Sequence, residues 1–402
     1  MMLRVRVAWR SLCHNRRQAL ALFLLSGCAM ALLLTAAFLG DGLRSGLISA
    51  VEPFDLLVGS GGSYQMVVNT VFLQDYPSGN VPYELVEKLR GDARVAAAAP
   101  LAFGDNYRGY RLVGTERELF RLPAAGREAW LRLDSGRIFS DSGREAVLGA
   151  RAARELGLKL GDEIYSAHGL IEDEKAERHA SYRVCGILKP CRGPYDRAIF
   201  VPLTAVWAGH GIKEDDSEDE DGHDEEDEHV HRRETTAIMV KPAGYAEAYQ
   251  LFVDFPRGQG AEMVFPSQVA ARLLSILGQA EWVFKAVGGA AGLLAAAIVF
   301  LVLYWSVCAR ADELRILGLL GVEKGDRMLM VLLEGLFVVV PGIVAGFMVG
   351  RLVLFGLADV IGDRTGLTVA SGAAPFDAAL AAMLAAAGLL GGILGGWRVM
   401  RE

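Results

Sequence analysis

Four apolar runs constrain this chain most, because each is long enough to cross a lipid bilayer. They cover residues 18–40, 286–309, 328–350 and 378–397, and Glu334 is the single charged residue in any of them. A membrane-spanning helix needs roughly 20 apolar residues. The chain as a whole is 52% hydrophobic but also 22% charged, which is too polar for a helix bundle alone. The sequence therefore predicts a membrane α-helical protein with four transmembrane helices and a large water-exposed part.

Residues 41–282 supply that water-exposed part, between the first and second predicted spans. Strand-like runs such as Gln65–Val71 alternate with helix-like runs such as Pro82–Arg90 and Glu145–Leu156, which is typical of an α+β domain. Segments 53–115 and 235–280 are expected to form one core, and 116–234 an insertion within it. The fold class is then four helices with a large extracytoplasmic α+β domain between helices 1 and 2.

Basic residues beside the spans predict the orientation in the membrane. Residues 1–17 hold five arginines and no acid, and they have the spacing of a helix that lies at the membrane surface. The segment 310–327 and the tail 398–402 are also rich in arginine or lysine. Because such residues concentrate in cytoplasmic segments, all three are expected in the cytoplasm, with the domain and a loop at 351–377 outside.

Two features involve cysteines. The basic leader followed by Leu25-Ser26-Gly27-Cys28 imitates a bacterial lipoprotein signal, but the apolar run continues unbroken to Leu39 and favours an uncleaved first span. Cys185 and Cys191 both fall in the outer domain, where oxidising conditions permit a disulfide. Two unpaired thiols are the alternative.

The segment 310–327 separates the second and third spans and has the composition of a contact surface. Asp312 and Glu313 begin a short helix-like stretch, and Gly321 and Gly325 end it. Its leucines are expected to pack into the groove of a partner protein: Leu314, Leu317, Leu319 and Leu320. The alternative is an amphipathic loop that lies on lipid headgroups.

Glycines recur every four residues in the last two spans. The two sets are Gly342, Gly346, Gly350 and Gly388, Gly392, Gly396. This spacing lets helix backbones touch, either within one chain or between two chains. An acid within a membrane is a functional candidate by default, but Glu334 has no basic residue in its own span. We therefore expect it to be a hydrogen-bonded structural acid.

Residues 209–233 form the most distinctive local sequence, a loop rich in histidine and acid. Four histidines, His210, His223, His229 and His231, lie among dense carboxylates, and thirteen acids fall between Lys213 and Glu234. Imidazole and carboxylate ligands suit zinc, so this loop is a candidate zinc-binding segment. A solvated acidic loop with incidental histidines is the alternative.

Several short motifs occur in an order that resembles the MacB/FtsX-type ABC transporter permeases. They are Ala8-Trp9-Arg10-Ser11-Leu12, Gly136-Arg137-Ile138-Phe139, Glu145-Ala146-Val147-Leu148-Gly149, Leu156–Asp162, Val184–Leu188 and, between the spans, Glu313-Leu314-Arg315-Ile316-Leu317-Gly318-Leu319-Leu320-Gly321. The resemblance extends over nearly the whole chain, including its four spans.

The resemblance implies a permease subunit in a bacterial inner membrane that works with a separate cytoplasmic ATPase and a second permease chain, expected to be identical. It assigns ATPase coupling to Asp312, Glu313, Leu314, Arg315, Leu317 and Gly321. The sequence has no phosphate-binding loop, so we expect a non-enzymatic chain that a partner energises.

The histidine-rich loop adds the expectation of zinc as cargo, delivered by an extracytoplasmic metal-binding protein. No feature indicates nucleic acid. Three other functions stay open: a lipoprotein-releasing or efflux permease, an FtsX-like regulator of a cell-wall hydrolase, and a metal sensor without an ATPase.

Overall fold

The chain divides into two compact units. A computed structural model describes residues 10, 14, 16–74, 79–124, 128–168, 178–212, 233–256, 260–365 and 375–401. The helical unit comprises Met1–Leu43, Ile276–Val360 and Ala370–Glu402, and the sheet unit comprises Arg44–Ser275 with Ile361–Val369. Residues 1–9, most of the predicted surface helix, lie outside the described residues.

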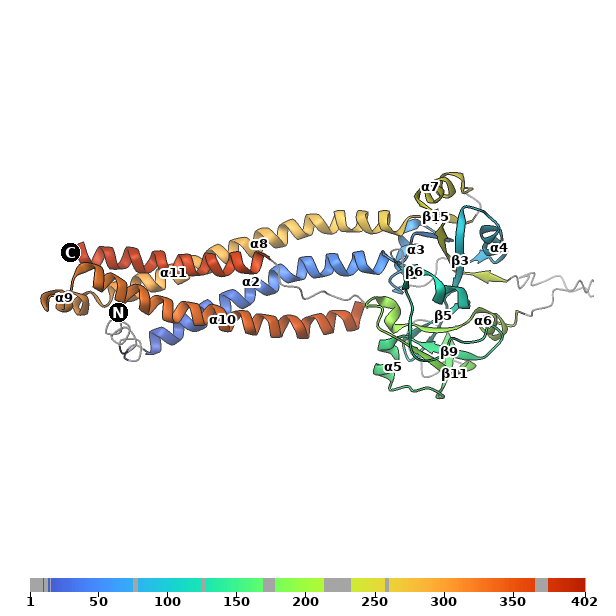
Figure 1. Cartoon of the computed structure of the whole chain (residues 1–402), viewed down its shortest axis with the longest axis horizontal. Coiled ribbons are helices and arrows are strands. Elements are labelled where there is room, and N and C mark those ends of the chain that lie inside the picture. Colours follow the sequence, from blue (N-terminus) through green and yellow to red (C-terminus); the bar gives the residue numbers. More distant parts are fainter. Residues whose placement is uncertain are drawn as a thin grey trace, which may run out of the picture. The chain divides into compact units, whose positions relative to one another are not determined.

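Four long helices make up the helical unit and run alongside one another (Figure 1). They are α2 (Arg16–Val51), α8 (Pro266–Cys308), α10 (Lys324–Thr365) and α11 (Pro375–Arg401), and the short α9 (Ala311–Leu319) joins α8 to α10. Each long helix contains a stretch apolar enough to cross a membrane: Arg16–Thr35, Gly289–Cys308, Lys324–Ala358 and Ala381–Arg401. The predicted fold class, with four spans and an α/β domain between the first two, is confirmed.

The helices are longer than the apolar runs that predicted them. Helix α10 continues to Thr365, so the first part of segment 351–377 is helical and the expectation of a loop from residue 351 was wrong. Arg351 ends the apolar run but not the helix, because arginine has good helix propensity. Residues 366–374 lie outside the described residues.

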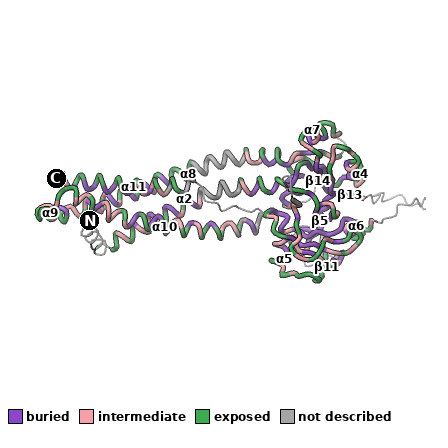
Figure 2. The backbone as a smooth tube through the Cα atoms, in the orientation of Figure 1, coloured by how far each residue is buried: buried purple, intermediate pink, exposed green. Residues whose placement is uncertain are grey.

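Apolar side chains cover both the inside and the outside of the helical unit. Buried and exposed stretches alternate along its helices (Figure 2), and the exposed residues include large apolar ones such as Leu32, Trp305 and Leu352. This pattern is expected where hydrocarbon replaces water, since lipid tails are as apolar as leucine and provide no hydrophobic drive for helix association.

The glycines of the third span pack against the first span. A Cβ atom at Gly346 would overlap the backbone of Gly27, and one at Gly342 would overlap Ser26. A Cβ atom at Gly350 would lie 3.2 Å from the Cα atom of Ala31, so α10 lies directly on α2. Of the two alternatives that the sequence left open, these glycines therefore make contacts within one chain.

The fourth span packs on the second and third. Gly391 and Gly395 approach the backbone of α8 at Phe300 and Tyr304. The predicted set, by contrast, meets side chains: Gly388 lies near Leu303 and Val339, Gly392 near Leu332, and Gly396 near Met328. The closest backbone contact of α11 is thus made by glycines beside the predicted set.

Replacing Gly346 with valine should separate α10 from α2, because the new side chain has no space against Gly27. Overpacking of this kind costs about 2 kcal/mol or more. We expect a lower midpoint of thermal unfolding for Gly346→Val in detergent. The matched control is Gly356→Val on the same helix, where a Cβ would meet nothing within 4 Å. Equal midpoints for the two variants would contradict the packing described.

The sheet unit is built on an eleven-stranded sheet. Its order is β12 (Ile199–Pro202), β9 (Glu145–Leu148), β11 (Arg178–Leu188), β10 (Glu163–His168), β4 (Asp105–Tyr107), β5 (Tyr110–Thr115), β3 (Val95–Ala102), β14 (Ala237–Pro242), β1 (Leu56–Gly59) and β15 (Glu262–Val264), with β8 (Leu133–Gly136) beside β11. Two-stranded ladders join β13 (Glu234–Thr235) to β2 (Val81–Pro82), and β6 (Pro123–Ala124) to β7 (Glu128–Ala129).

Part of this sheet closes into a small barrel. Strand β12 pairs with β9 on one side and, in parallel, with β5 on the other, where Ile199 is opposite Leu112. The ring therefore runs β12–β9–β11–β10–β4–β5 and back to β12. Its core includes Tyr182, Ile164 and Val201, all fully buried. Helices α5 (Ala150–Leu156) and α6 (Leu203–Gly209) and the 3₁₀ turn η2 (Pro194–Arg197) belong to this part.

The remaining strands form an open four-stranded sheet, β3–β14–β1–β15. Helices α4 (Glu84–Arg90) and α7 (Tyr245–Asp254) bury apolar residues against it, with α3 (Ser63–Thr70) and the turn η1 (Arg117–Arg121) nearby. Residues before 116 and after 234 supply all four strands. The barrel also takes in β4 and β5, so its first strand lies upstream of residue 116, where the insertion was expected to begin.

Two local predictions were wrong. The expected helix Glu145–Leu156 is strand β9 followed by α5, because Gly149 between them lies against the backbone of Asp196 with no space for a side chain. The expected strand Gln65–Val71 belongs to helix α3, which buries Met66, Val67 and Thr70 along one face. In both cases tertiary packing outweighs the propensity of a short apolar run.

Cys185 and Cys191 are free thiols, which settles the open question of a disulfide. Burial, together with the nearby Glu145 carboxylate, raises the pKa of the Cys185 thiol to about 11. Burial also raises the pKa of Cys191 well above its ordinary value. Since the thiolate is the reactive form, both thiols should react slowly near neutral pH.

Alkylation of Cys185 should therefore accelerate about tenfold per pH unit up to a pH of about 11. The measurement is the rate of iodoacetamide labelling in a variant whose other cysteines are serine. A cysteine introduced at the exposed Ser142 is the control, and its rate should level off near pH 9, just above an ordinary thiol pKa. A plateau near pH 9 for Cys185 as well would contradict the prediction.

Candidate functional site

The segment 310–327 folds into helix α9 and two short turns between the second and third spans. Asp312 and Glu313 lie in the first turn of α9, where negative charge is favourable near the positive end of the helix dipole. The helix ends before Gly321, whose φ of 88° lies in the left-handed region that glycine adopts at little cost. Helix α10 then begins at Lys324.

One face of α9 is packed into the helical unit. Leu314 is 5% exposed and lies in a cluster with Val307 of α8, Val331 of α10 and Val399 of α11, against which Leu317 also packs. Leu314 was expected to enter a partner's groove, and that expectation was wrong, because three helices of its own chain cover it. The same contacts make α9 part of the helical unit.

The other face of α9 is uncovered. Leu319 is 89% exposed and Leu320 is 75% exposed, and Ile316 beside them is also exposed. Asp312 lies on the surface, 3.7 Å from the guanidinium of Arg315. The outer face of α9, which we define as Asp312, Arg315, Ile316, Leu319 and Leu320, thus combines apolar contact area with charge.

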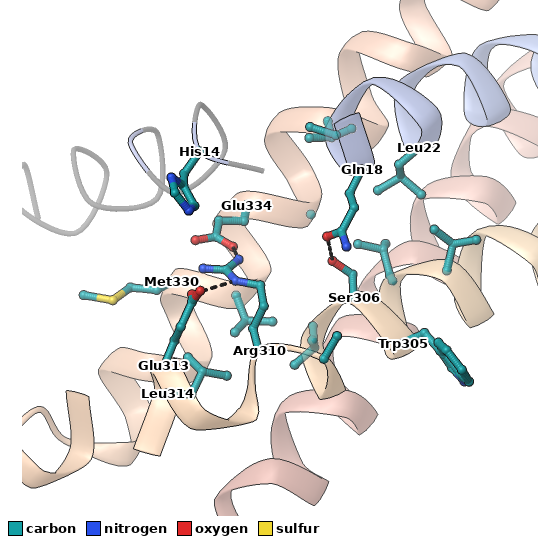
Figure 3. A pocket seen from close by; sticks show the side chains of 18 of the residues that line it. His14, Gln18, Leu22, Trp305, Ser306, Arg310, Glu313, Leu314, Met330 and Glu334 are labelled. Atoms are coloured by element: carbon teal, nitrogen blue, oxygen red, sulfur yellow. Dashed lines mark hydrogen bonds and ion pairs between the residues drawn. The ribbon is translucent and has the colours of Figure 1, made fainter. Parts of the chain in front are cut away.

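Arg310 joins α9 to the third span (Figure 3). Its Nη1 donates a hydrogen bond to Glu334 Oε2 at 2.5 Å, and its Nε donates to Glu313 Oε2 at 2.9 Å. The side chains of Arg310 and Glu334 are 20% and 16% exposed, whereas that of Glu313 is 54% exposed. We call this arrangement of one guanidinium and two carboxylates the Arg310 bridge.

Glu334 is hydrogen-bonded, as predicted, and its basic companion Arg310 comes from outside its own span. The sequence could have indicated this ion pair, because an acid within a membrane requires a counter-charge and arginines lie at the adjacent span ends. It could not choose between Arg310 and Arg327, which is closer in sequence. The structure selects Arg310.

Arg327, in the first turn of α10, makes a second polar contact with α9. Its Nη1 donates to the backbone oxygen of Leu314 at 3.0 Å, and its guanidinium lies over Gly318, where a Cβ atom would be 2.7 Å from Nη1. A glycine at position 318 therefore leaves room for Arg327. These contacts of Arg310, Arg327 and Gly318 were not predicted from the sequence, although all three residues belong to the segment 310–327.

A cavity of about 990 Å³ lies beside the Arg310 bridge. Residues from α2, α8, α9 and α10 line it. Figure 3 shows Gln18 and Leu22 of α2, Trp305 of α8 and Met330 of α10 around it. Most of its lining is apolar, and among its polar residues the Ser306 hydroxyl donates to Gln18 Oε1 at 3.4 Å.

The predicted metal-binding residues are described only at His210. It follows the last turn of α6, and its Nε2 lies 3.8 Å from the carboxylate of Asp105, which is 7% exposed. His223, His229 and His231 lie outside the described residues. Across the ranges that the structure does describe, no three histidine, cysteine or acidic side chains come together as metal ligands.

Comparison with known protein families is decisive for the class of protein. Residues 27–250 match the model of the MacB-like periplasmic core domain, which is more than half of the chain. The chain belongs to the MacB/FtsX-type ABC transporter permease family. It is thus a multi-pass membrane protein with an extracellular domain, and permeases of this family are transporter components that typically work with an ATPase partner.

Solved structures similar to this permease include two outer domains. The periplasmic region of MacB from Actinobacillus actinomycetemcomitans has 11% sequence identity and a TM-score of 0.34, covering 56% of this chain and 95% of that region. The extracellular domain of the noncanonic ABC-type transporter YknZ from Gram-positive bacteria has 13% identity and a TM-score of 0.32, covering 52% and 98%. No curated protein sequence matches the chain.

Proposed function

We propose that this permease transmits the conformational change of a separate cytoplasmic ATPase to its extracellular domain, and that α9 is the contact for that ATPase. The observation that carries the proposal is the two-sided packing of α9. Leu314 fixes the inner face to three helices, while Leu319 and Leu320 leave an apolar outer face open. A helix with this arrangement can bind a partner and move the spans with it.

Charge supports the cytoplasmic placement of α9. Arg310 and Arg327 flank it and Arg315 lies within it. Arg398 and Arg401 lie in the last turn of α11, whose Val399 packs in the same cluster as Leu314. Arginine near span ends favours the cytoplasmic side. We therefore propose that both termini and α9 face the cytoplasm of a bacterium, and that two copies of the permease act together.

Lipoprotein release, efflux and activation of a cell-wall hydrolase remain alternatives for what the outer domain does. All three share the same requirement at α9, because each needs an ATPase to drive the outer domain. The presence of an ATPase contact therefore separates these functions from a metal sensor that has no ATPase.

Replacing both Leu319 and Leu320 with serine should weaken binding of the ATPase without unfolding the permease. Burial of a leucine contributes about 2 kcal/mol, so loss of even one such contact should reduce affinity roughly 30-fold. The measurement is co-purification of an ABC ATPase with the permease from cells that produce it naturally, together with the ATP hydrolysis rate of that ATPase. Leu160→Ser, at an exposed leucine of the barrel, is the control. Undiminished co-purification of the double variant would exclude the outer face of α9 as the contact.

We further propose zinc as the cargo, held at the extracellular domain by the histidine-rich loop. The supporting observation is the position of His210, at the end of α6 where this loop begins, within 3.8 Å of the buried Asp105. A neutral imidazole and a carboxylate are both zinc ligands. In this proposal they would be the ordered ligands to which loop histidines add.

Calorimetric titration of the purified full chain with zinc should show binding that disappears when residues 213–232 are deleted. His210→Ala should weaken the binding about tenfold or more, because it removes one ordered ligand. His14→Ala, a histidine of the helical unit, is the control and should bind as the wild type does. Identical titrations for the wild type and the deletion would end the zinc proposal and leave the α9 proposal intact.

A further inference from the structure

The Arg310 bridge connects Glu313, which lies beside the outer face of α9, with Glu334 in the interior of the third span. Glu313 is half exposed and directly follows Asp312 of that outer face, whereas Glu334 lies inside α10. Both carboxylates accept hydrogen bonds from the same guanidinium. A displacement of α9 therefore acts on Glu334 through a single side chain.

We propose that Arg310 is a positioning residue that couples the movement of α9 to the third span through Glu334. The inference rests on the proposed function, since it specifies how movement passes from the ATPase contact to the spans. It assigns a role to Glu334 and Arg310 that is separate from the ATPase contact itself.

Geometry favours Arg310 over the other contacts of α9 for this role. The cluster around Leu314 is apolar and has no directional bond, and Arg327 donates to a backbone oxygen of α9 from the start of α10. Arg310 alone among these donates to a carboxylate well inside a span, seven residues beyond Arg327 along α10. A guanidinium can bind two carboxylates at once because its donors form a rigid planar fork, which a lysine ammonium lacks.

Burial makes the loss of either partner of the bridge costly. Ion pairs at an exposed surface contribute little, but the removal of one partner from a buried pair leaves the other charge uncompensated. Glu334 is 16% exposed within a helix that crosses the membrane, so the loss of Arg310 would leave its carboxylate in apolar surroundings. The cavity beside the bridge then gives α9 space to separate from α10.

The test compares four variants of the full chain in lipid nanodiscs. They are Arg310→Gln, Glu334→Gln, the double variant Arg310→Gln with Glu334→Gln, and Arg310→Lys. The first measurement needs no ATPase and is the amide hydrogen exchange of residues 311–319. We expect each single glutamine variant to exchange about tenfold faster, the double variant no faster than the singles, and Arg310→Lys to fall between them and the wild type.

The matched control is Arg351→Gln, which removes an arginine from α10 at a place where it contacts Phe347 rather than α9. Its exchange over 311–319 should equal that of the wild type. Equal exchange in Arg310→Gln and Arg351→Gln would overturn the bridge. Additive increases of the exchange rate in the double variant would overturn it as well. If Arg310 and Glu334 act through the hydrogen bond between them, either single substitution already removes that bond and the second one adds nothing.

The second measurement is the ATP hydrolysis rate of the partner ATPase with each variant. If the bridge transmits movement, stimulation by the permease should fall about tenfold in Arg310→Gln and Glu334→Gln while co-purification with the ATPase persists. Faster exchange with unchanged stimulation would overturn the transmission role and reduce the bridge to a structural contact. Failure of the wild type to bind any ATPase would instead refute the proposed function, and the exchange data would still decide whether the bridge exists.

Discussion

Close contact between helix backbones determines the structure of the helical unit. Lipid removes the hydrophobic drive between spans, so association depends on dispersion contacts that need small residues. The approach of Gly346 to Gly27 places α10 on α2, and Gly391 and Gly395 place α11 on α8. With these spans fixed, Val331 and Val399 form part of the surface on which Leu314 of α9 rests. The position of α9 is thus a consequence of glycine packing deeper in the unit.

The positions of the spans could be predicted from the sequence, because hydrophobicity along a chain is a local property. Their number and the domain between the first two could be read from charge-free runs, as could the segment 310–327. The helices that pack against these glycines could not be predicted. A spacing of four residues shows which face of a helix is lined by small side chains, but not which other helix packs against that face. The same limit explains why Gly391 and Gly395 make the closest backbone contact although Gly388, Gly392 and Gly396 have the same spacing.

The outer domain shows a second limit of local reasoning. Its barrel closes through the parallel pairing of β12 with β5, strands that lie more than eighty residues apart. Such a pairing depends on long-range burial, not on any property of the short run Ile199–Pro202 itself. The helix predicted at Glu145–Leu156 was wrong for the same reason, because Gly149 is required by its contact with Asp196, which is distant in sequence. Helical periodicity alone gives no sign of that contact.

The candidate site combines what a sequence motif can and cannot reveal. The stretch Glu313–Gly321 pointed to a segment whose residues have different physical roles: Leu314 packs inward, Gly318 leaves room for Arg327, and Glu313 accepts a hydrogen bond from Arg310. Two of those partners, Arg310 and Arg327, lie outside the motif, and Glu334 lies in the next span. A motif of this kind is therefore best understood together with the residues that its members contact. In this permease those contacts place the half-exposed carboxylate of Glu313 and the carboxylate of Glu334, inside the third span, on the same guanidinium, so α9 and the third span are joined through one side chain.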